Sequence, residues 1–278
     1  MEGNGSIVWS VIIPAYDEAE RLPAYLREVV AFFEERGKPY EVIVVDDGSR
    51  DATRERVREL EAAHPRLRLI ALPQNRGKGH AVRVGMANAR GAFRLFADAD
   101  GATPIVELKR LEPALEAGAD IVIGSRALAD PAVSVQARVH RVWAGRVFNW
   151  LVARLGLQGI ADSQCGFKCF RAAAAEHLFR AIRTDGYGFD VELLLLAQRR
   201  GYRIAEVAIN WADQPGSKVR VLADGPRMLW QILAARARSA PPKVARVPRP
   251  APRVPARERL RRLSTRLRSR IPPGDEGR

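Results

Sequence analysis

Hydrophobic positions in the first half of the chain follow two alternating spacings. Short apolar runs rich in β-branched residues are typical of buried strands, and apolar residues three or four positions apart are typical of amphipathic helices. The runs predict strands at 6–15, 41–49, 66–73, 92–100 and 119–126. The helical spacing predicts helices at 18–36, 49–63, 79–90 and 105–117. Because helices alternate with buried strands, we predict an α/β fold with a mostly parallel sheet and helices on both of its faces.

Polar residues follow each of these predicted strands. In open α/β sheets, ligands bind in the crevice beyond the carboxyl ends of the strands. We therefore expect one rim of the sheet to collect the following side chains: Tyr16, Glu18, Asp46, Asp47, Asp98, Asp100, Ser125 and Arg126. Each of these positions, taken alone, also fits an ordinary turn or helix cap. Because all of these side chains are expected at the same edge of the sheet, a binding site is the favoured interpretation.

The stretch "FRLFADADGATP" places two carboxylates, Asp98 and Asp100, at the end of a predicted strand. Side chains at i and i+2 of an extended segment point the same way, so the two charges repel unless a cation or solvent relieves them. An acidic turn after a strand is the simpler alternative. No Gly-x-Gly-x-x-Gly loop follows the first strand and no P-loop motif is present, which argues against a dinucleotide site and a P-loop site.

The chain has 278 residues and a net charge of +14 that is concentrated near one end. From Ala240 to Arg278 there are twelve Lys/Arg and three Asp/Glu, with six prolines in "APPKVARVPRPAPRVP". Such a composition cannot build a hydrophobic core. We predict one domain at 1–239 and a flexible Pro/Arg-rich basic tail at 240–278.

Within this tail, four apolar residues fall at helical spacing: Leu260, Leu263, Leu267 and Ile271. Arginines occupy the remaining faces, which is typical of a short basic amphipathic helix on an anionic membrane surface. A disordered basic tail fits the same residues. A nucleic-acid-binding protein with a basic arm is a third alternative, but the acidic rim would repel phosphates without a metal, so we expect no nucleic-acid partner.

Two cysteines, Cys165 and Cys169, lie in "CGFKCF", with His177 further on. A fourth zinc ligand at a suitable spacing is absent from the sequence, so buried thiols in a reducing compartment are the favoured interpretation. The opening "MEGNGS" is neither basic nor apolar, and no uncharged apolar stretch is long enough to cross a membrane. We therefore expect neither a signal peptide nor a transmembrane helix.

Several motifs occur in a recognisable order: "VIIPAYDE", "VIVVDDGSRDAT", "NRGKGHAVRVGM" and "FADADGAT". Together they resemble the motifs of glycosyltransferase family 2, whose GT-A fold is a Rossmann-like α/β domain. Later motifs, "IVIGSR", "DSQCGFKCF", "GFDVELLLLAQRRGY" and "INWADQPGSKV", resemble one branch more narrowly. That branch contains the dolichyl-phosphate β-glucosyltransferases and related polyprenyl-phosphate glycosyltransferases. The resemblance extends from about Val8 to Ser239.

The resemblance implies a nucleotide-sugar donor, most simply UDP-glucose, and a Mg²⁺ or Mn²⁺ ion. Asp98 and Asp100 occupy the Asp-x-Asp motif that binds the ion with the nucleotide, and Gln164 falls where the family has a polar contact to donor or metal. The residues implied at the base and ribose are Pro14, Tyr16 and Glu18, with Asp46 or Asp47 accepting a hydrogen bond from the base. Lys78 would lie near the nucleotide, and a loop with Ser217 and Lys218 could close over the diphosphate.

The acceptor implied by the branch is a polyprenyl phosphate. A phosphate monoester is already anionic, so it needs cationic ligands rather than a general base. Arg126, with Arg138 or Arg141 on a predicted helix at 136–154, would supply them. The alternative is a soluble hydroxyl acceptor, which needs a base, and Asp190 in "GFDVE" is the candidate. We predict an inverting enzyme held peripherally on the inner, cytoplasmic face of the membrane.

Overall fold

A seven-stranded sheet forms the centre of the computed structural model, which describes residues 7–136, 148–154, 156–214, 230, 231, 233, 234 and 236. Its strand order is β3-β2-β1-β4-β7-β5-β8. The strands span Trp9–Ala15 (β1), Tyr40–Asp46 (β2), Leu67–Ala71 (β3), Phe93–Ala97 (β4), Ile121–Ser125 (β5), Phe167–Arg171 (β7) and Ile204–Ala208 (β8). Two short strands, β6 (Val135–Gln136) and β9 (Trp211–Ala212), form a separate parallel pair.

A helix follows each of the first four strands, as the hydrophobic spacing predicts, and two helices later in the chain were not predicted from the spacing. They span Leu22–Arg36 (α1), Thr53–Ala63 (α2), Lys78–Asn88 (α3), Leu108–Glu116 (α4), Ala172–Phe179 (α6) and Phe189–Arg199 (α7). A 3₁₀ turn at Ile105–Glu107 (η1) leads directly into α4, so the helix predicted at 105–117 is present with a tighter start. The predicted α/β fold is confirmed.

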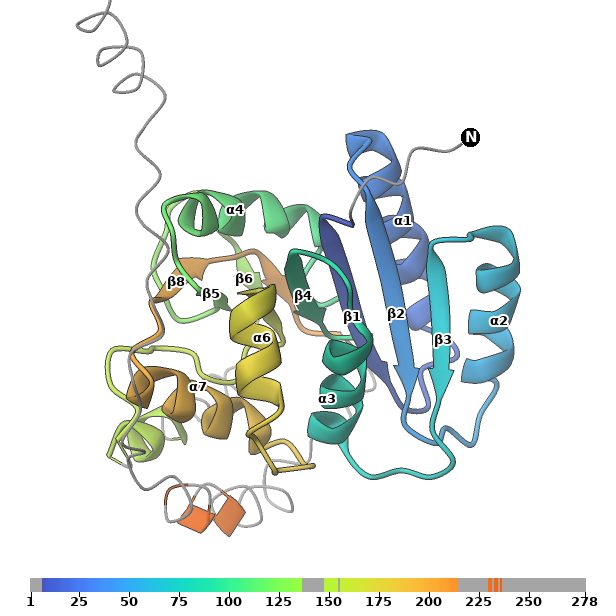
Figure 1. The fold of residues 1–278 in the computed structure, drawn as a ribbon. Coiled ribbons are helices and arrows are strands. Elements are labelled where there is room, and N and C mark those ends of the chain that lie inside the picture. The colour runs from blue at the N-terminus through green and yellow to red at the C-terminus, as the bar shows by residue number, and fades with distance from the viewer. Residues whose placement is uncertain are drawn as a thin grey trace, which may run out of the picture. The chain divides into compact units, whose positions relative to one another are not determined.

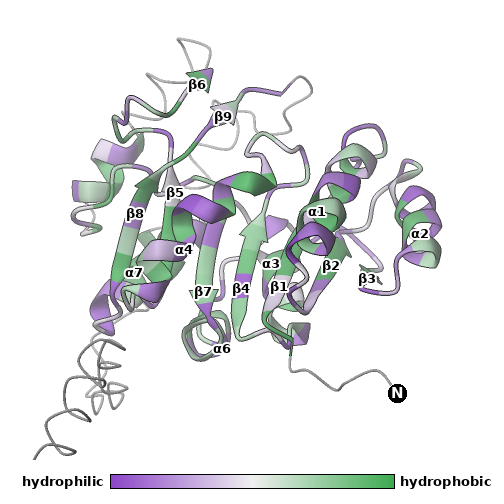
Figure 2. Ribbon diagram, turned by 90° about the horizontal axis from the view of Figure 1, so that it is seen from above, coloured by the Kyte–Doolittle hydropathy of each residue, from purple (hydrophilic) through white to green (hydrophobic). Residues whose placement is uncertain are grey.

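Helices cover both faces of the sheet, and its strands are largely hydrophobic (Figures 1 and 2). Along β1, whose seven residues are all buried, Val11 and Ile13 pack into the core beneath α1, α2 and α4. Ile12 points the opposite way, into the core beneath α3, α6 and α7. A strand that is buried on both faces shows no polar alternation, which is why β1 is apolar except for the buried Ser10.

Strand β7 breaks the parallel pattern and was not predicted. It lies antiparallel between β4 and β5. Phe167 and Cys169 pack on one face of the sheet and Phe170 packs on the other. Lys168, which lies between them, is completely buried.

The reversed direction of β7 determines which residues meet at the rim. Ala97, the last residue of β4, pairs with Phe167, the first residue of β7. The chain leaving β4 and the chain entering β7 therefore meet at the edge where β1, β2 and β5 also end, and Asp98 N donates to Gly166 O at 3.0 Å. This edge carries the predicted site.

Candidate active site

The two predicted metal-binding carboxylates lie side by side at the end of β4. Asp98 Oδ1 is 2.6 Å from Lys78 Nζ, which comes from the start of α3. Asp100 Oδ1 accepts a hydrogen bond from Ala102 N at 3.1 Å. Burial, together with the neighbouring charge of Asp98, raises the pKa of Asp100 above its ordinary value. The pair therefore carries the mutual repulsion that the spacing predicts.

Gly166 makes room for the Asp98 carboxylate. A Cβ at position 166 would overlap both carboxylate oxygens of Asp98. Since the φ of Gly166 does not lie in the left-handed region, this glycine is required by space and not by backbone conformation. The "CGFK" motif thus builds part of the wall around the predicted metal-binding pair.

The carboxylate pair fits a hard divalent cation that is shared with a diphosphate. Within the described residues, no three His, Cys, Asp or Glu side chains form a group that could hold a metal. Mg²⁺ commonly takes one or two protein carboxylates and completes its shell with phosphate oxygens and water. Asp98 and Asp100 fit that mode of binding, and a cation between them would relieve their repulsion.

Lys78 is a partly enclosed cation beside this pair. Burial by itself lowers its pKa, but the charges of Asp98 and Asp190 outweigh that effect and raise the pKa above its ordinary value. Its ammonium also lies 5.1 Å from the centre of the Phe96 ring. Lys78 is therefore held charged at the rim, close to the position that the resemblance implies for the nucleotide.

The acids after β2 hold the neighbouring loops. Asp46 pairs with Arg54 Nε at 2.5 Å, and Asp47 accepts hydrogen bonds from Arg76 N at 3.0 Å and Gly77 N at 2.7 Å. The Asp47 carboxylate thus fixes the loop that carries Lys78. After β1, Glu18 is buried and pairs with Arg21, while Tyr16 is half-buried. Pro14 is buried within β1 itself.

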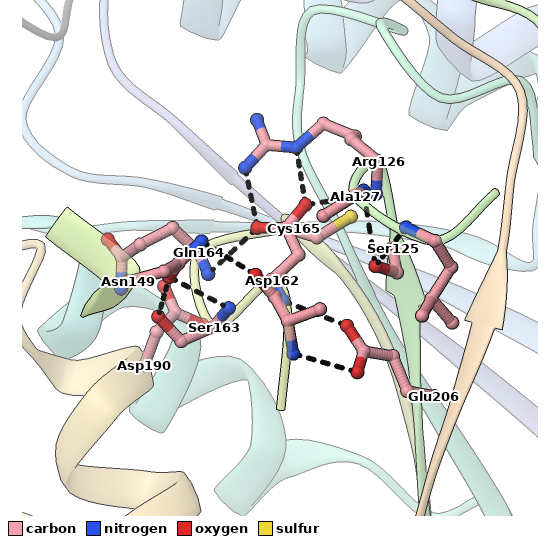
Figure 3. Close-up of polar contacts among 12 residues, drawn as sticks. Ser125, Arg126, Ala127, Asn149, Asp162, Ser163, Gln164, Cys165, Asp190 and Glu206 are labelled. Atoms are coloured by element: carbon pink, nitrogen blue, oxygen red, sulfur yellow. Dashed lines mark hydrogen bonds and ion pairs between the residues drawn. The ribbon is translucent and has the colours of Figure 1, made fainter. Parts of the chain in front are cut away.

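Arg126 forms an ion pair with a buried aspartate, Asp162 (Figure 3). Its Nε and Nη2 donate to the two carboxylate oxygens of Asp162 at 2.6 and 2.8 Å, and its backbone N donates to the same group at 3.0 Å. Burial would raise the pKa of Asp162, but the Arg126 charge and its hydrogen bonds outweigh this and hold the pKa below its usual value. The guanidinium also lies 5.3 Å from the centre of the Trp211 ring.

A second buried ion pair joins β7 to α7. Lys168 Nζ donates to Asp190 Oδ1 and to Cys165 O, both at 2.5 Å. Burial raises the pKa of Asp190 despite the two nearby lysines, Lys168 and Lys78, which act to lower it. Gln164 lies on the loop before β7, and its buried Nε2 has no hydrogen-bond partner in the described part of the chain.

Comparison with known proteins identifies the family. The sequence model described as "Glycosyl transferase family 2" matches residues 10–179. The chain belongs to glycosyl transferase family 2. It is 42% identical to the dolichyl-phosphate beta-glucosyltransferase of Drosophila melanogaster, over 79% of this chain and 71% of that protein. It is 40% identical to the Homo sapiens protein of the same name, over 76% of this chain and 69% of that protein.

Solved structures agree with the GT-A fold of this family 2 glycosyltransferase. One is the glucosyl-3-phosphoglycerate synthase of Mycobacterium tuberculosis in complex with Mn²⁺ and UDP-glucose. It superposes with a TM-score of 0.63 at 21% sequence identity, covering 83% of this chain and 79% of that chain. At this identity the likeness establishes the fold alone.

The structure brings together three of the predicted rim residues of the glycosyltransferase and three residues that the resemblance implied for its site. Asp98, Asp100, Lys78, Gln164, Arg126 and Asp190 all lie around the junction of β4, β7 and β5. Arg138, Arg141, Ser217, Lys218 and the tail at 240–278 lie outside the described residues. Their roles, and the boundary at 239/240, stay predictions.

Four residues of this site were missed from the sequence: Asp162, Gly166, Lys168 and Glu206. The "DSQCGFK" motif contains three of them, and a lysine inside an apolar run is the one signal that could have been used. Cys165 and Cys169 are buried free thiols, as predicted. Burial raises the pKa of Cys165 to about 12, so it is protonated at neutral pH.

Proposed function

We propose that this glycosyltransferase moves glucose from UDP-glucose to the phosphate of a dolichyl or related polyprenyl phosphate, with inversion at the anomeric carbon. Relatives that are 36–42% identical carry the name dolichyl-phosphate beta-glucosyltransferase, which supports the donor sugar and the acceptor. One structural observation carries the proposal. An acidic pair, Asp98 and Asp100, and a cationic residue, Arg126, lie at the same sheet edge on either side of β7.

The acidic pair suits the donor. Departure of the nucleotide builds negative charge on its diphosphate, and Mg²⁺ or Mn²⁺ bound there would neutralise that charge. Asp98 and Asp100 would hold the ion, and Gln164 would contribute a polar contact to the donor. Lys78, 2.6 Å from Asp98, would interact with the diphosphate from the side of α3. Binding of Mn²⁺ with UDP-glucose by a structural neighbour supports this arrangement.

The ends of β1 and β2 would bind the base and ribose of the donor. Pro14, Tyr16 and Glu18 come from the end of β1 and the turn after it, and Asp46 and Asp47 come from the end of β2. Both aspartates are buried, so a hydrogen bond from the base to either of them would be sheltered from water.

Arg126 suits an anionic acceptor. The lipid phosphate is ionised at neutral pH and would attack the anomeric carbon directly, so the reaction needs no general base. Arg126, whose side chain is about one-third exposed, would orient that phosphate by charge and hydrogen bonds. Arg138 or Arg141 would add a second cation.

A hydroxyl acceptor is the second candidate, with Asp190 as general base. The raised pKa of Asp190 favours this role, since a base works best when its pKa approaches the working pH. Its geometry does not favour it: Asp190 is 2% exposed and forms an ion pair with Lys168 at 2.5 Å. We therefore assign Asp190 to positioning the lysines around the donor sugar.

We further propose that the enzyme works peripherally on the cytoplasmic face of a membrane. No helix in the described part of the chain is long and apolar enough to span a bilayer. Trp150 is 55% exposed, with the Arg154 guanidinium 4.8 Å from its ring centre, a combination typical of membrane interfaces. Removing residues 240–278 should weaken binding to anionic vesicles, most visibly at low salt, yet preserve turnover of a short-chain acceptor.

The decisive experiment offers the purified enzyme UDP-glucose, Mn²⁺ and either a short-chain dolichyl phosphate or a soluble alcohol. We expect glucose on the phosphate, and we expect calorimetry to show tighter binding of UDP than of GDP. Arg126→Ala should weaken use of the lipid phosphate far more than nucleotide binding. Transfer to the alcohol alone, stopped by Asp190→Asn, would establish the second candidate instead.

A further inference from the structure

Two carboxylates support Arg126 in succession, the buried Asp162 and the half-buried Glu206 (Figure 3). Asp162, which is 2% exposed, holds the guanidinium through two parallel hydrogen bonds. Glu206, on the neighbouring strand β8, accepts hydrogen bonds from Asp162 N at 2.8 Å and from Ala161 N at 2.9 Å. Because β5 and β8 pair in parallel register, the strand that carries Glu206 is fixed relative to the end of β5.

The opposite side of the same loop is also anchored. Asn149 Nδ2 donates to Ala161 O at 2.8 Å, and Asn149 Oδ1 accepts from Ser163 Oγ at 2.8 Å. Ala161, Asp162 and Ser163 are therefore each held by a side chain from outside this segment. These contacts fix the backbone that carries Asp162, and the Asp162 carboxylate in turn accepts hydrogen bonds from both the backbone N and the guanidinium of Arg126, which fixes the direction of the arginine.

The geometry leaves a defined part of Arg126 for a ligand. The Asp162 carboxylate accepts hydrogen bonds from Nε and Nη2 of Arg126. Within the described residues, no hydrogen bond involves Nη1 of Arg126. In Figure 3 this third nitrogen extends away from Asp162. The Trp211 ring, 5.3 Å from the guanidinium carbon, restricts the plane of the group.

We propose that Asp162, held by Glu206, is a positioning residue that orients Arg126 toward the acceptor phosphate. The inference rests on the proposed role of Arg126. The pair has no net charge, so Asp162 weakens the long-range attraction of Arg126 for anions while it fixes the direction of its remaining N–H groups.

The test is a double-mutant cycle with Arg126→Ala, Asp162→Asn and the combined variant, using UDP-glucose, Mn²⁺ and a short-chain dolichyl phosphate. Asp162→Asn keeps the shape of the side chain and removes its negative charge. We expect kcat to fall on the order of 10- to 100-fold from loss of orientation. The KM for the acceptor should not rise, because the arginine keeps its charge. The combined variant should be no slower than Arg126→Ala alone.

Additive effects of the two substitutions, unchanged kcat in Asp162→Asn, or a raised acceptor KM with unchanged kcat would each overturn the inference. If Arg126→Ala itself leaves acceptor use unchanged, the proposed role of Arg126 fails. That result differs from an additive cycle, in which Arg126 matters and Asp162 acts separately.

Two further variants separate positioning from folding. Glu176→Gln breaks the 2.6 Å ion pair between Glu176 and the buried Arg94, which lies at the end of β4 away from the site. This variant should lower stability without changing acceptor kinetics. Glu206→Gln leaves Arg126 and Asp162 in place but weakens the support of Asp162. It should lower kcat in the same direction by a smaller factor, which keeps the inference testable if Asp162→Asn does not fold. Unchanged kcat in a folded Glu206→Gln enzyme would contradict it.

Discussion

Charges are arranged differently on the two sides of the active-site edge. On the proposed donor side, Asp98 pairs with Lys78, whereas Asp100 has no ion-pair partner within the described residues, and the charge of Asp98 helps to raise the pKa of Asp100. On the proposed acceptor side, the buried Asp162 has its own cation, Arg126, and the buried Asp190 between the two sides is likewise paired with Lys168. The donor side is therefore prepared for a cation from outside, whereas the acceptor side is compensated internally. This difference supports the proposal that charge serves binding on the donor side and orientation on the acceptor side.

Replacing either donor-side acid should have the largest effect. Asp98→Asn or Asp100→Asn removes a ligand for the cation that would neutralise the leaving diphosphate. We expect glucose transfer to fall on the order of a thousandfold, since such stabilisation amounts to several kcal/mol. Transfer is measured with UDP-glucose and a short-chain dolichyl phosphate, and thermal unfolding should confirm an intact fold. Full activity in excess EDTA would contradict the metal-dependent mechanism.

Breaking the buried ion pair between Lys168 and Asp190 should mainly lower the free energy of unfolding. Lys168→Met leaves Asp190 buried without its cation, and the loss of unfolding free energy should be about 3–5 kcal/mol. Denaturant unfolding measures this loss. The double variant Lys168→Met/Asp190→Leu removes both charges and should recover most of it, because an apolar pair of similar size needs no compensation.

An exposed ion pair is the matched control for that experiment. Arg56 and Glu59 lie 3.5 Å apart with side chains 57% and 65% exposed, so Glu59→Gln should change stability by less than about 1 kcal/mol. If Lys168→Met lowers the free energy of unfolding as little as Glu59→Gln does, Lys168 and Asp190 do not form the buried ion pair that the structure indicates.

Displacing the Asp98 carboxylate without removing it should have a smaller effect. Gly166→Ala puts a methyl group into the space that Asp98 occupies. Titration with Mn²⁺ in the presence of UDP should show affinity about 10- to 100-fold weaker, the range found when a metal ligand loses its support. Gly85→Ala creates a similar overlap with Ile12 in the core, away from the site. It should lower stability and leave Mn²⁺ affinity unchanged; equal weakening in both variants would refute the role of Gly166.

The smallest expected effect is a change in pH dependence. The pKa of Asp162 is lowered in the folded protein, mainly because Arg126 outweighs the effect of burial. A carboxylate of this kind stabilises the fold above its unfolded pKa, about 3.9, and loses that contribution as pH falls through the folded value. The stability difference between wild type and Asp162→Asn should therefore shrink as unfolding is measured from pH 7 toward pH 3. A difference that stays constant over this range would contradict the pairing.

The sequence by itself determined the parallel half of the molecule. Hydrophobic periodicity and turn residues act over a few positions, so β1 to β5 and the helices between them follow from local pattern. The same pattern predicts that Asp98, Asp100 and Arg126 lie at one edge, because parallel strands end on the same side. The family motifs added roles for these residues, including Lys78 and Gln164.

Only the tertiary structure decided how the buried ion pairs around β7 are built. Strand β7 inserts antiparallel between β4 and β5, and nothing local specifies that position. Lys168 and Asp190 are 22 residues apart, and Arg126 and Asp162 are 36 apart. Whether a charge can be buried depends on the distance to its partner and on the exclusion of water, and both are set by long-range strand order. Neither quantity can be read from the spacing of residues along the chain. These ion pairs can therefore be identified only from the complete sheet.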